Sequence, residues 1–208
     1  MPSPSMFWDK VAEKYAASPI KDMASYEATM DRTSAHLNGD DKVLEVGCGT
    51  GTTALKLAPS VAHITSSDVS AKMIEIAKAK ARDQNIENVT FVQATPMDVA
   101  LDANAPYDAV LAYNFLHLVE DLPATMRRIH DLLKPGGMFI SKSVCLKGQG
   151  FYYPILIAVM RFFGKAPFVA MLTGSELEVA IRDAGFEIVE AAGIPTGRPN
   201  HFVVARKR

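Results

Sequence analysis

Cysteine is scarce in this chain of 208 residues, which contains only Cys48 and Cys145. Two cysteines supply neither a disulfide framework nor the ligand spacing of a structural metal site, so a reducing compartment is the default. The residues at 1–5 lack the basic and apolar regions of a signal peptide. No uninterrupted apolar run approaches the roughly 20 residues that span a bilayer. We therefore expect a cytoplasmic protein.

An excess of charge of one sign is also missing. The 22 Lys and Arg residues are balanced by 23 Asp and Glu residues, which leaves a formal net charge of -1. Nucleic-acid binders need clustered basic residues to neutralise phosphates, and the short basic tail at 206–208 does not provide them. The acidic residues form no convincing cluster for a catalytic metal ion. The sequence thus predicts neither a nucleic-acid partner nor a metal.

Apolar residues are plentiful, at 49% of the chain, and can build one domain with a sizeable core. Strand and helix patterns alternate through the middle of the sequence. They predict strands near 42–47, 61–67, 88–93, 107–113 and 137–144, and helices near 51–58, 70–83, 121–134 and 175–184. Such alternation is typical of a parallel sheet with helices on both faces, in which the functional strand ends share one edge.

Both ends of the chain depart from this alternation. At the start, helices are expected over 6–16, capped by Ser5, and over 22–37. Near the other end, strands at 186–190 and 202–205 follow each other with no helix between them. Two such strands must pair as an antiparallel hairpin, because a parallel pair would need a longer crossover.

The most informative segment is 43–51, in which an apolar strand containing Glu45 ends in three alternate glycines, Gly47, Gly49 and Gly51. Glycine permits positive φ and close approach of a ligand, and a helix pattern follows, so we expect a nucleotide-like ligand at the end of this strand. The spacing G-x-G-x-G fits neither a dinucleotide fingerprint nor a Walker loop. Glu45 would also repel a pyrophosphate, which favours a cationic or zwitterionic ligand.

This segment resembles motif I of the class I S-adenosylmethionine-dependent methyltransferases. The rest of the chain is also similar to this family: residues at about 40–145 match its motifs, and 175–208 match its pattern of helix and strands. It implies a Rossmann-like, doubly wound α/β fold with a mostly parallel seven-stranded sheet and an antiparallel last strand. It also implies a single domain over 1–208. The expected parts are a helical lid at 1–40, a cofactor-binding core at 41–145, an apolar insertion at 146–174, and a helix with a terminal hairpin at 175–208.

Asp68 closes the second predicted strand, and Ser70 is placed to cap the next helix. An acid at this strand end can accept both hydroxyls of a ribose, although a turn residue without a ligand is the alternative. The third strand ends at Ala94 and Thr95, where many members of the family carry an acid for the adenine amine. The Thr95 hydroxyl, backbone carbonyls or Asp98 are the possible substitutes.

The resemblance implies S-adenosylmethionine as cofactor and S-adenosylhomocysteine as product. Met73 would lie under the adenine or serve as a core residue, and Tyr113 and Asn114 would border both cofactor and acceptor. The expected cofactor-binding residues are Glu45, Gly47, Cys48, Gly49, Gly51, Asp68, Val69, Met73, Ala94, Thr95, Met97, Tyr113 and Asn114.

Two residues are candidates for a catalytic role. His117 follows the fourth strand on the same edge, where a neutral imidazole can accept a proton, with packing as the alternative. Tyr15 belongs to a segment, 7–16, that resembles the opening helix of many small-molecule methyltransferases. The resemblance places it near the methionine end of the cofactor, with helix packing as the alternative. Arg198 and His201, in the turn of the hairpin, are weaker candidates for substrate contact.

Methyl transfer requires alignment and exclusion of water rather than a protein nucleophile, so a missing catalytic dyad does not argue against an enzyme. The expected acceptor is a small, apolar or amphiphilic molecule, lipid-like molecules included. The apolar segment 151–172 would cover its pocket, lie on a membrane surface or form a dimer contact. The acceptor atom and the oligomeric state, monomer or homodimer, stay open. A non-catalytic cofactor-binding module and an NAD-binding oxidoreductase are the alternatives.

Overall fold

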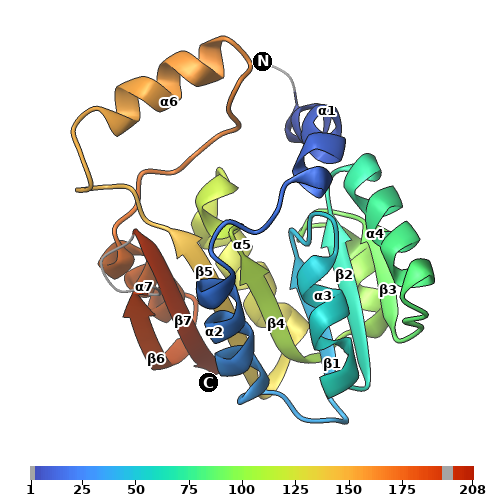
Figure 1. The fold of residues 1–208 in the computed structure, drawn as a ribbon. Helices are drawn as coiled ribbons and strands as arrows, with labels where there is room; N and C mark the ends of the chain where they lie inside the picture. Colours follow the sequence, from blue (N-terminus) through green and yellow to red (C-terminus); the bar gives the residue numbers. More distant parts are fainter. Residues whose placement is uncertain (1–2, 194–198) are drawn as a thin grey trace.

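The computed structural model describes residues 3–193 and 199–208. In this part of the chain, seven strands form one sheet in the order β3-β2-β1-β4-β5-β7-β6 (Figure 1). Strands β1 to β5 pair in parallel, and β7 runs antiparallel to both β5 and β6. The predicted Rossmann-like α/β fold with an antiparallel last strand is therefore confirmed. The strands are β1 Lys42–Val46, β2 His63–Asp68, β3 Val89–Gln93, β4 Tyr107–Tyr113, β5 Leu133–Val144, β6 Phe186–Gly193 and β7 Asn200–Lys207.

Helices cover both faces of the sheet. Helices α2, α3 and α4 lie on one face and α5 and α7 on the other (Figure 1). Their buried side chains belong to two separate hydrophobic clusters, one on each face. The α-helices are α1 Pro4–Ala17, α2 Met23–Ser34, α3 Thr52–Leu57, α4 Ala71–Asp83, α5 Leu122–Leu132, α6 Tyr153–Phe162 and α7 Gly174–Asp183. Short 3-10 turns are η1 Ala58–Ser60, η2 Val99–Asn104 and η3 Leu116–Leu118.

The central strands are apolar because both of their faces are buried. In β1, Val43 belongs to the core under α2, α3 and α4, whereas Leu44 and Val46 belong to the core under α5 and α7. All three side chains are 0% exposed. A strand covered on both faces reads as a continuous apolar run rather than an alternating one. This burial makes the sheet a rigid support for the loops at its carboxyl edge.

The first two helices differ in detail from the prediction. The cap of α1 is Ser3 rather than Ser5, because the Met6 N–H donates to Ser3 Oγ at 3.3 Å and Pro4 occupies the first helical turn, where it is favoured. Helix α2 ends at Ser34 instead of 37, since the amide of His36 bonds to a carbonyl three residues back, as in a turn.

Strand β5 also begins earlier than predicted, at Leu133 rather than near 137. Leu133 pairs with Tyr107, and a bulge separates this pair from Ala109 and Met138. The Lys-Pro-Gly-Gly segment at 134–137 therefore lies within an irregular strand.

Helix α6 stands apart from the sheet in Figure 1 and is joined to the rest of the fold by two extended connections. It occupies the predicted apolar segment 151–172, and the remainder of that segment returns without regular structure. Among the residues that the structure describes, no helix has the length and apolar character to cross a membrane.

Candidate functional site

The loop between β1 and α3 contains three glycines with left-handed backbone conformations. Their φ angles are +70° at Gly47, +54° at Gly49 and +75° at Gly51. A Cβ at Gly47 would overlap the Phe115 ring, and one at Gly51 would lie 2.8 Å from an aromatic ring of β3. A Cβ at Gly49 would instead meet Tyr15 Cε1 at 3.7 Å, an ordinary contact. Packing within the protein thus requires two of the glycines, whereas an added Cβ at Gly49 would make only an ordinary contact with Tyr15.

Asp68 lies at the end of β2, beside this loop, and is 9% exposed. The Gly49 N–H donates to Asp68 Oδ2 and the Ser70 N–H donates to Oδ1, both at 2.9 Å. A carboxylate has about four acceptor positions, so two remain for the hydroxyls of a ligand. Burial raises the pKa of Asp68 despite the two backbone hydrogen bonds. Asp68 therefore both fixes the loop and offers acceptors next to Gly49.

Glu45 lies beneath the loop and is 2% exposed. Ser66 Oγ donates to Glu45 Oε2 at 2.7 Å, and the backbone amide of Ala54 in α3 also bonds to the carboxylate. Burial, the largest influence, raises the pKa of Glu45 to about 7. At neutral pH Glu45 is thus partly protonated, and a cation bound above the loop would favour the negatively charged carboxylate.

The loop after β3 is organised by Asp98. The backbone N–H and the hydroxyl of Thr95 both donate to Asp98 Oδ2, at 2.6 and 2.8 Å, and these bonds lower the pKa of Asp98. The Thr95 hydroxyl is therefore used within the loop. Arg128 of α5 pins the same loop by donating to the Pro96 carbonyl at 3.1 Å. Of the substitutes for an adenine-binding acid, Asp98 has both the charge and the exposure.

The remaining predicted cofactor residues differ in their access to this edge. Met97 is 49% exposed and Val69 is half-buried, whereas Ala94 is buried. Cys48 is half-buried, and its N–H donates to the Ser67 carbonyl at 2.9 Å. Met73 is 1% exposed. For Met73 this position supports the packing role rather than contact with adenine, because its side chain lies within the core.

Tyr113 does not direct its hydroxyl toward the loop edge. The hydroxyl hydrogen-bonds to Thr33 Oγ1 of α2, and burial raises the pKa of Tyr113. The hydroxyl therefore helps to hold α2 on the sheet, and the position of Tyr113 beside cofactor and acceptor stays a prediction. Asn114, the next residue, is exposed with φ +52°, and its N–H donates to the Lys142 carbonyl at 2.7 Å. Asn114 is thus exposed at the end of β4, and its contact with cofactor or acceptor stays a prediction.

His117 lies in η3, just beyond β4, and is 8% exposed. Its backbone carbonyl accepts from the Ala170 N–H at 2.7 Å, which ties η3 to the segment returning from α6. Its Nδ1 has no hydrogen-bond partner within residues 3–193 and 199–208. Burial lowers the pKa of His117 to about 4, so the imidazole is neutral at pH 7. A buried, neutral and unpartnered imidazole can accept a proton or a hydrogen bond from a ligand.

Helix α1 reaches the same site from the N-terminal side. Asp9 Oδ1 accepts from Ser70 Oγ at 2.6 Å and from the Lys72 N–H at 3.1 Å. These bonds lower the pKa of Asp9 and hold α1 on the first turn of α4. One turn and a half further along α1, Tyr15 is 52% exposed and lies beside Gly49. Asp9, which no sequence pattern singles out, is thus the residue that attaches the predicted lid next to Asp68.

The weaker candidates lie elsewhere. His201 Nε2 is 3.0 Å from Glu178 Oε1, so this imidazole is engaged with α7. Arg198 lies outside the described residues. Nowhere in 3–193 and 199–208 are three His, Cys, Asp or Glu side chains grouped to hold a metal ion.

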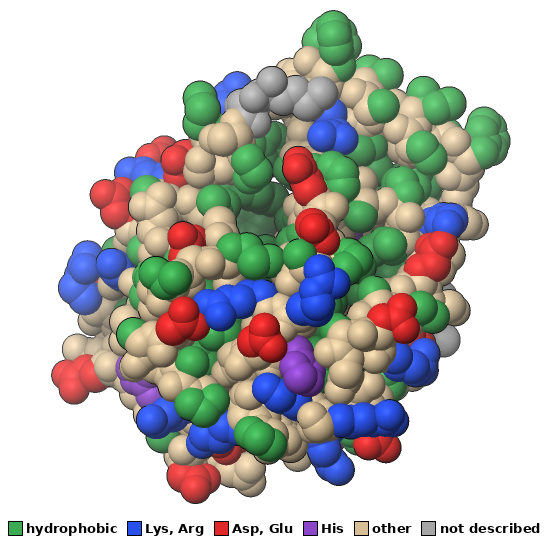
Figure 2. Space-filling view, turned by 180° about the vertical axis from the view of Figure 1, so that it is seen from behind, with side chains coloured by type: hydrophobic (Ala, Val, Ile, Leu, Met, Phe, Trp, Pro, Cys, Tyr) green, Lys and Arg blue, Asp and Glu red, His purple; other side chains and the backbone are tan. Residues whose placement is uncertain are grey.

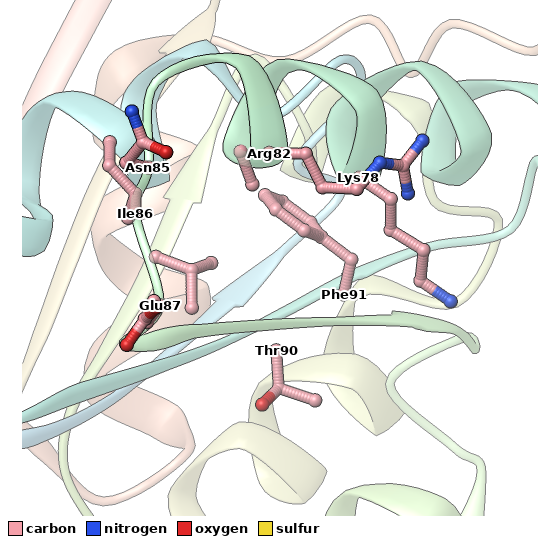
Figure 3. Close-up of a pocket in the computed structure, with 9 residues that line it drawn as sticks. Lys78, Arg82, Asn85, Ile86, Glu87, Thr90 and Phe91 are labelled. Atoms are coloured by element: carbon pink, nitrogen blue, oxygen red, sulfur yellow. The ribbon is translucent and has the colours of Figure 1, made fainter.

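An open hollow between α4 and β3 is a separate feature (Figure 3). Lys78 and Arg82 of α4 and Phe91 of β3 contribute to its lining. Asn85 and Glu87 place it near the start of β3. Ligands of open α/β sheets bind at the carboxyl ends of the strands, so this hollow is not the expected site.

Comparison with known proteins identifies the family. A family model described as a methyltransferase domain matches residues 44–139, which include the glycine loop, Asp68 and β4. The chain contains a class I S-adenosylmethionine-dependent methyltransferase domain. S-adenosylmethionine is the cofactor of this family. The acceptor positions that Asp68 leaves unused beside Gly49 fit a ligand with a ribose.

Two curated relatives of this methyltransferase are ubiquinone biosynthesis O-methyltransferases. The protein from Acinetobacter baumannii is 26% identical over 74% of this chain and 66% of its own length. The protein from Pseudomonas syringae is 25% identical over 90% of this chain and 81% of its own length. The chain thus spans about two thirds of the length of the first of these relatives.

The fold is shared with a solved structure of a [4+2]-cyclase, SpnF. The match has a TM-score of 0.73 and 21% identity and covers 92% of this methyltransferase and 83% of the cyclase. Because a protein described as a cyclase has this fold, the fold alone does not fix the reaction. The assignment of chemistry must come from the site.

Proposed function

We propose that this chain transfers the methyl group of S-adenosylmethionine to an oxygen atom of a small, apolar or amphiphilic molecule. The observation that carries the proposal is the position of Asp68, whose carboxylate is fixed by the amides of Gly49 and Ser70, beneath Tyr15, with two acceptor positions left for a ligand. Glu45 beneath the loop provides negative charge for a cationic ligand, and Asp98 is our candidate for the adenine amine.

The bound cofactor supplies a methyl group that its sulfonium already activates. The protein then has to hold the reactants in line and exclude water. Tyr15 and Trp8 of α1 contact each other edge to face, and Tyr15 lies over Gly49, so α1 is the element that would cover the cofactor. His117 would accept the proton of the acceptor hydroxyl from its neutral state.

Oxygen is proposed as the acceptor atom because both curated relatives described above are named O-methyltransferases. A hydroxyl also gains more from a neighbouring base than a thiolate or a free amine does. Figure 2 shows a hollow lined by hydrophobic side chains on the side between α1 and α6, which supports an apolar acceptor. An amphiphilic or lipid-like acceptor would be reached at a membrane surface, so the proposal includes peripheral contact with membranes.

Cofactor binding and turnover are tested separately. Isothermal titration with S-adenosylmethionine, S-adenosylhomocysteine and NAD is expected to show binding of the first two. Binding of NAD alone would contradict the proposal in favour of an oxidoreductase. Labelled cofactor offered with phenols, quinols, thiols, amines and lipid headgroups then identifies the acceptor, with a methylated hydroxyl as the expected product. Cofactor binding without any methylated product would indicate a non-catalytic module.

Replacement of His117 by Ala is expected to lower kcat about 100-fold while cofactor affinity stays unchanged, because a general base acts on the acceptor. The pH profile provides a second readout. Since burial lowers the pKa of His117 to about 4, the acidic limb of kcat in the unmodified enzyme should fall near pH 4 rather than near 6.5. Steady-state kinetics from pH 4 to 8 measures both effects.

The matched control for this substitution is His63→Ala. His63 begins β2 and hydrogen-bonds to Thr90, away from the carboxyl edge. His63→Ala should leave kcat and its pH profile unchanged. Normal turnover of His117→Ala at every pH would make His117 a packing residue.

Replacement of Asp9 by Ala is expected to speed cofactor release about 10-fold, because it removes two charge-assisted hydrogen bonds between α1 and α4. Stopped-flow displacement of S-adenosylhomocysteine measures this rate. Glu13→Ala, on the same helix, is the control. An unchanged release rate in Asp9→Ala would show that α1 does not restrain the cofactor.

A further inference from the structure

Helix α6 and the turn before it carry a band of apolar side chains on their outer surface. No residue of α6 is buried, and Phe151, Ile155 and Phe162 are 90%, 65% and 80% exposed. Hydrophobic side chains gather along the upper edge in Figure 2, where α6 lies. We call this band the outer stripe; it consists of Phe151, Tyr152, Ile155, Leu156, Val159, Met160, Phe162 and Phe163.

The outer stripe follows the period of a helix. Phe151, Ile155 and Val159 recur at every fourth position, and Tyr152 begins a parallel row in the same way. At 3.6 residues per turn, the two rows together cover about half of the helix surface. The opposite side is half-buried and includes Arg161, whose guanidinium lies 5.1 Å from the centroid of the Phe168 ring. The apolar side of α6 thus faces outward, the reverse of a helix packed on a core.

The segment that carries the outer stripe contains basic residues and no acidic ones. Residues 146–172 include Lys147, Arg161 and Lys165 and no Asp or Glu. Arg161 and Lys165 lie near the end of α6, and Lys147, which pairs with Glu176 of α7, lies before it. In a symmetric contact between two copies of this chain, the exposed Lys165 after α6 would meet no acidic residue from the same segment of the partner copy. An anionic lipid surface is complementary both to the apolar stripe and to this charge.

We propose that the outer stripe of α6 lies in the headgroup region of an anionic lipid bilayer. The aromatic residues at its two ends, Phe151 and Tyr152 before the helix and Phe162 and Phe163 after it, suit the membrane–water interface. With 10 residues, α6 is about 15 Å long, so it lies on the membrane surface without crossing it. The proposal deepens the proposed function, since this contact would bring an amphiphilic acceptor to the site, but the contact itself does not depend on catalysis.

Flotation with lipid vesicles tests the contact. The whole protein should float with mixed phosphatidylcholine–phosphatidylglycerol vesicles, and it should float less with phosphatidylcholine alone or at high salt. The double substitution Phe162→Asp with Phe163→Asp should weaken vesicle binding about 100-fold or more, because two exposed aromatic side chains no longer enter the interface. The matched control is Val179→Asp with Val189→Asp, which adds the same charge at apolar positions of α7 and β6 that are 53% and 47% exposed.

Several results would overturn the contact. The first is that the unmodified protein floats with neither vesicle. The second is that the Phe162 and Phe163 variant floats as well as the control variant. A dimer seen by light scattering that this variant converts to a monomer, without vesicle binding, would assign the outer stripe to a second copy. A raised KM for a water-soluble acceptor with unchanged flotation would make α6 a pocket lid.

The proposed function fails independently of this contact. Isothermal titration of the same two double variants with S-adenosylmethionine should give the unmodified affinity, because the outer stripe lies outside the glycine loop. Vesicle binding without cofactor binding would leave the membrane contact standing and refute the methyltransferase proposal. Cofactor binding without vesicle binding would refute the membrane contact and leave the methyltransferase proposal standing.

Discussion

Replacing Asp68 by Ala is expected to weaken the binding of S-adenosylmethionine about 30- to 1,000-fold. If Asp68 holds the ribose as proposed, the substitution would remove two charge-assisted hydrogen bonds, which together contribute about 2–4 kcal/mol. The structure explains why a large loss of affinity is expected at this residue. The Gly49 and Ser70 amides hold the Asp68 carboxylate in place without a ligand, so binding costs little side-chain entropy. Isothermal titration measures the change in dissociation constant.

The same two amides lose their acceptor in Asp68→Ala, so a control must separate lost binding from lost stability. Asp121→Ala is the matched control, since Asp121 accepts from the Ala124 N–H at 2.8 Å and caps α5. Asp121→Ala should lower the free energy of unfolding by about 1 kcal/mol and leave cofactor affinity unchanged. Asp68→Asn, which keeps one oxygen acceptor but no charge, should fall between Asp68→Ala and the unmodified protein. A dissociation constant that Asp68→Ala leaves unchanged would remove this residue from the site.

The fold was predictable because its signals are local. Alternating strand and helix patterns and the glycine segment at 43–51 each lie within a short stretch of sequence, and together they predict the sheet and its carboxyl edge. The hairpin of β6 and β7 was predictable for the same reason, since no helix separates the two strands. The helix boundaries were predicted less accurately. The start of α1 depends on whether Ser3 or Ser5, on either side of Pro4, caps the helix.

The parts of the site that depend on tertiary contacts were not predictable. Asp9 reaches Ser70 across 61 positions of sequence, and no local pattern distinguishes it from other acids on α1. The same holds for Tyr113, whose hydroxyl bonds to Thr33 in a helix that precedes it by 80 positions. The direction of α6 is a further case. An apolar run predicts a helix, but only its packing shows which side faces outward.

The three glycines of the loop illustrate the same limit and give the largest expected effect on binding. Sequence alone treats Gly47, Gly49 and Gly51 as equivalent. In the structure, a Cβ at Gly51 would lie 2.8 Å from Phe91 and 2.9 Å from Ala77, whereas a Cβ at Gly49 would make only an ordinary contact with Tyr15 at 3.7 Å. Substitution of Gly51 should therefore damage the fold, and substitution of Gly49 should damage the ligand site.

Gly49→Val is accordingly expected to lower cofactor affinity about 1,000-fold or more, because its branched side chain would fill the ligand space and exceed the loss in Asp68→Ala. The positive φ of +54° should also cost about 1–2 kcal/mol of unfolding free energy. Gly136→Val separates these two effects. Gly136 has φ +77° with nothing within 4 Å of an added Cβ, so it carries the same backbone strain far from the loop and should bind the cofactor normally. Thermal unfolding without ligand and isothermal titration distinguish strain from lost space. If Gly49→Val and Gly136→Val are equally destabilised and both bind S-adenosylmethionine with unmodified affinity, the space above Gly49 is not where the cofactor lies.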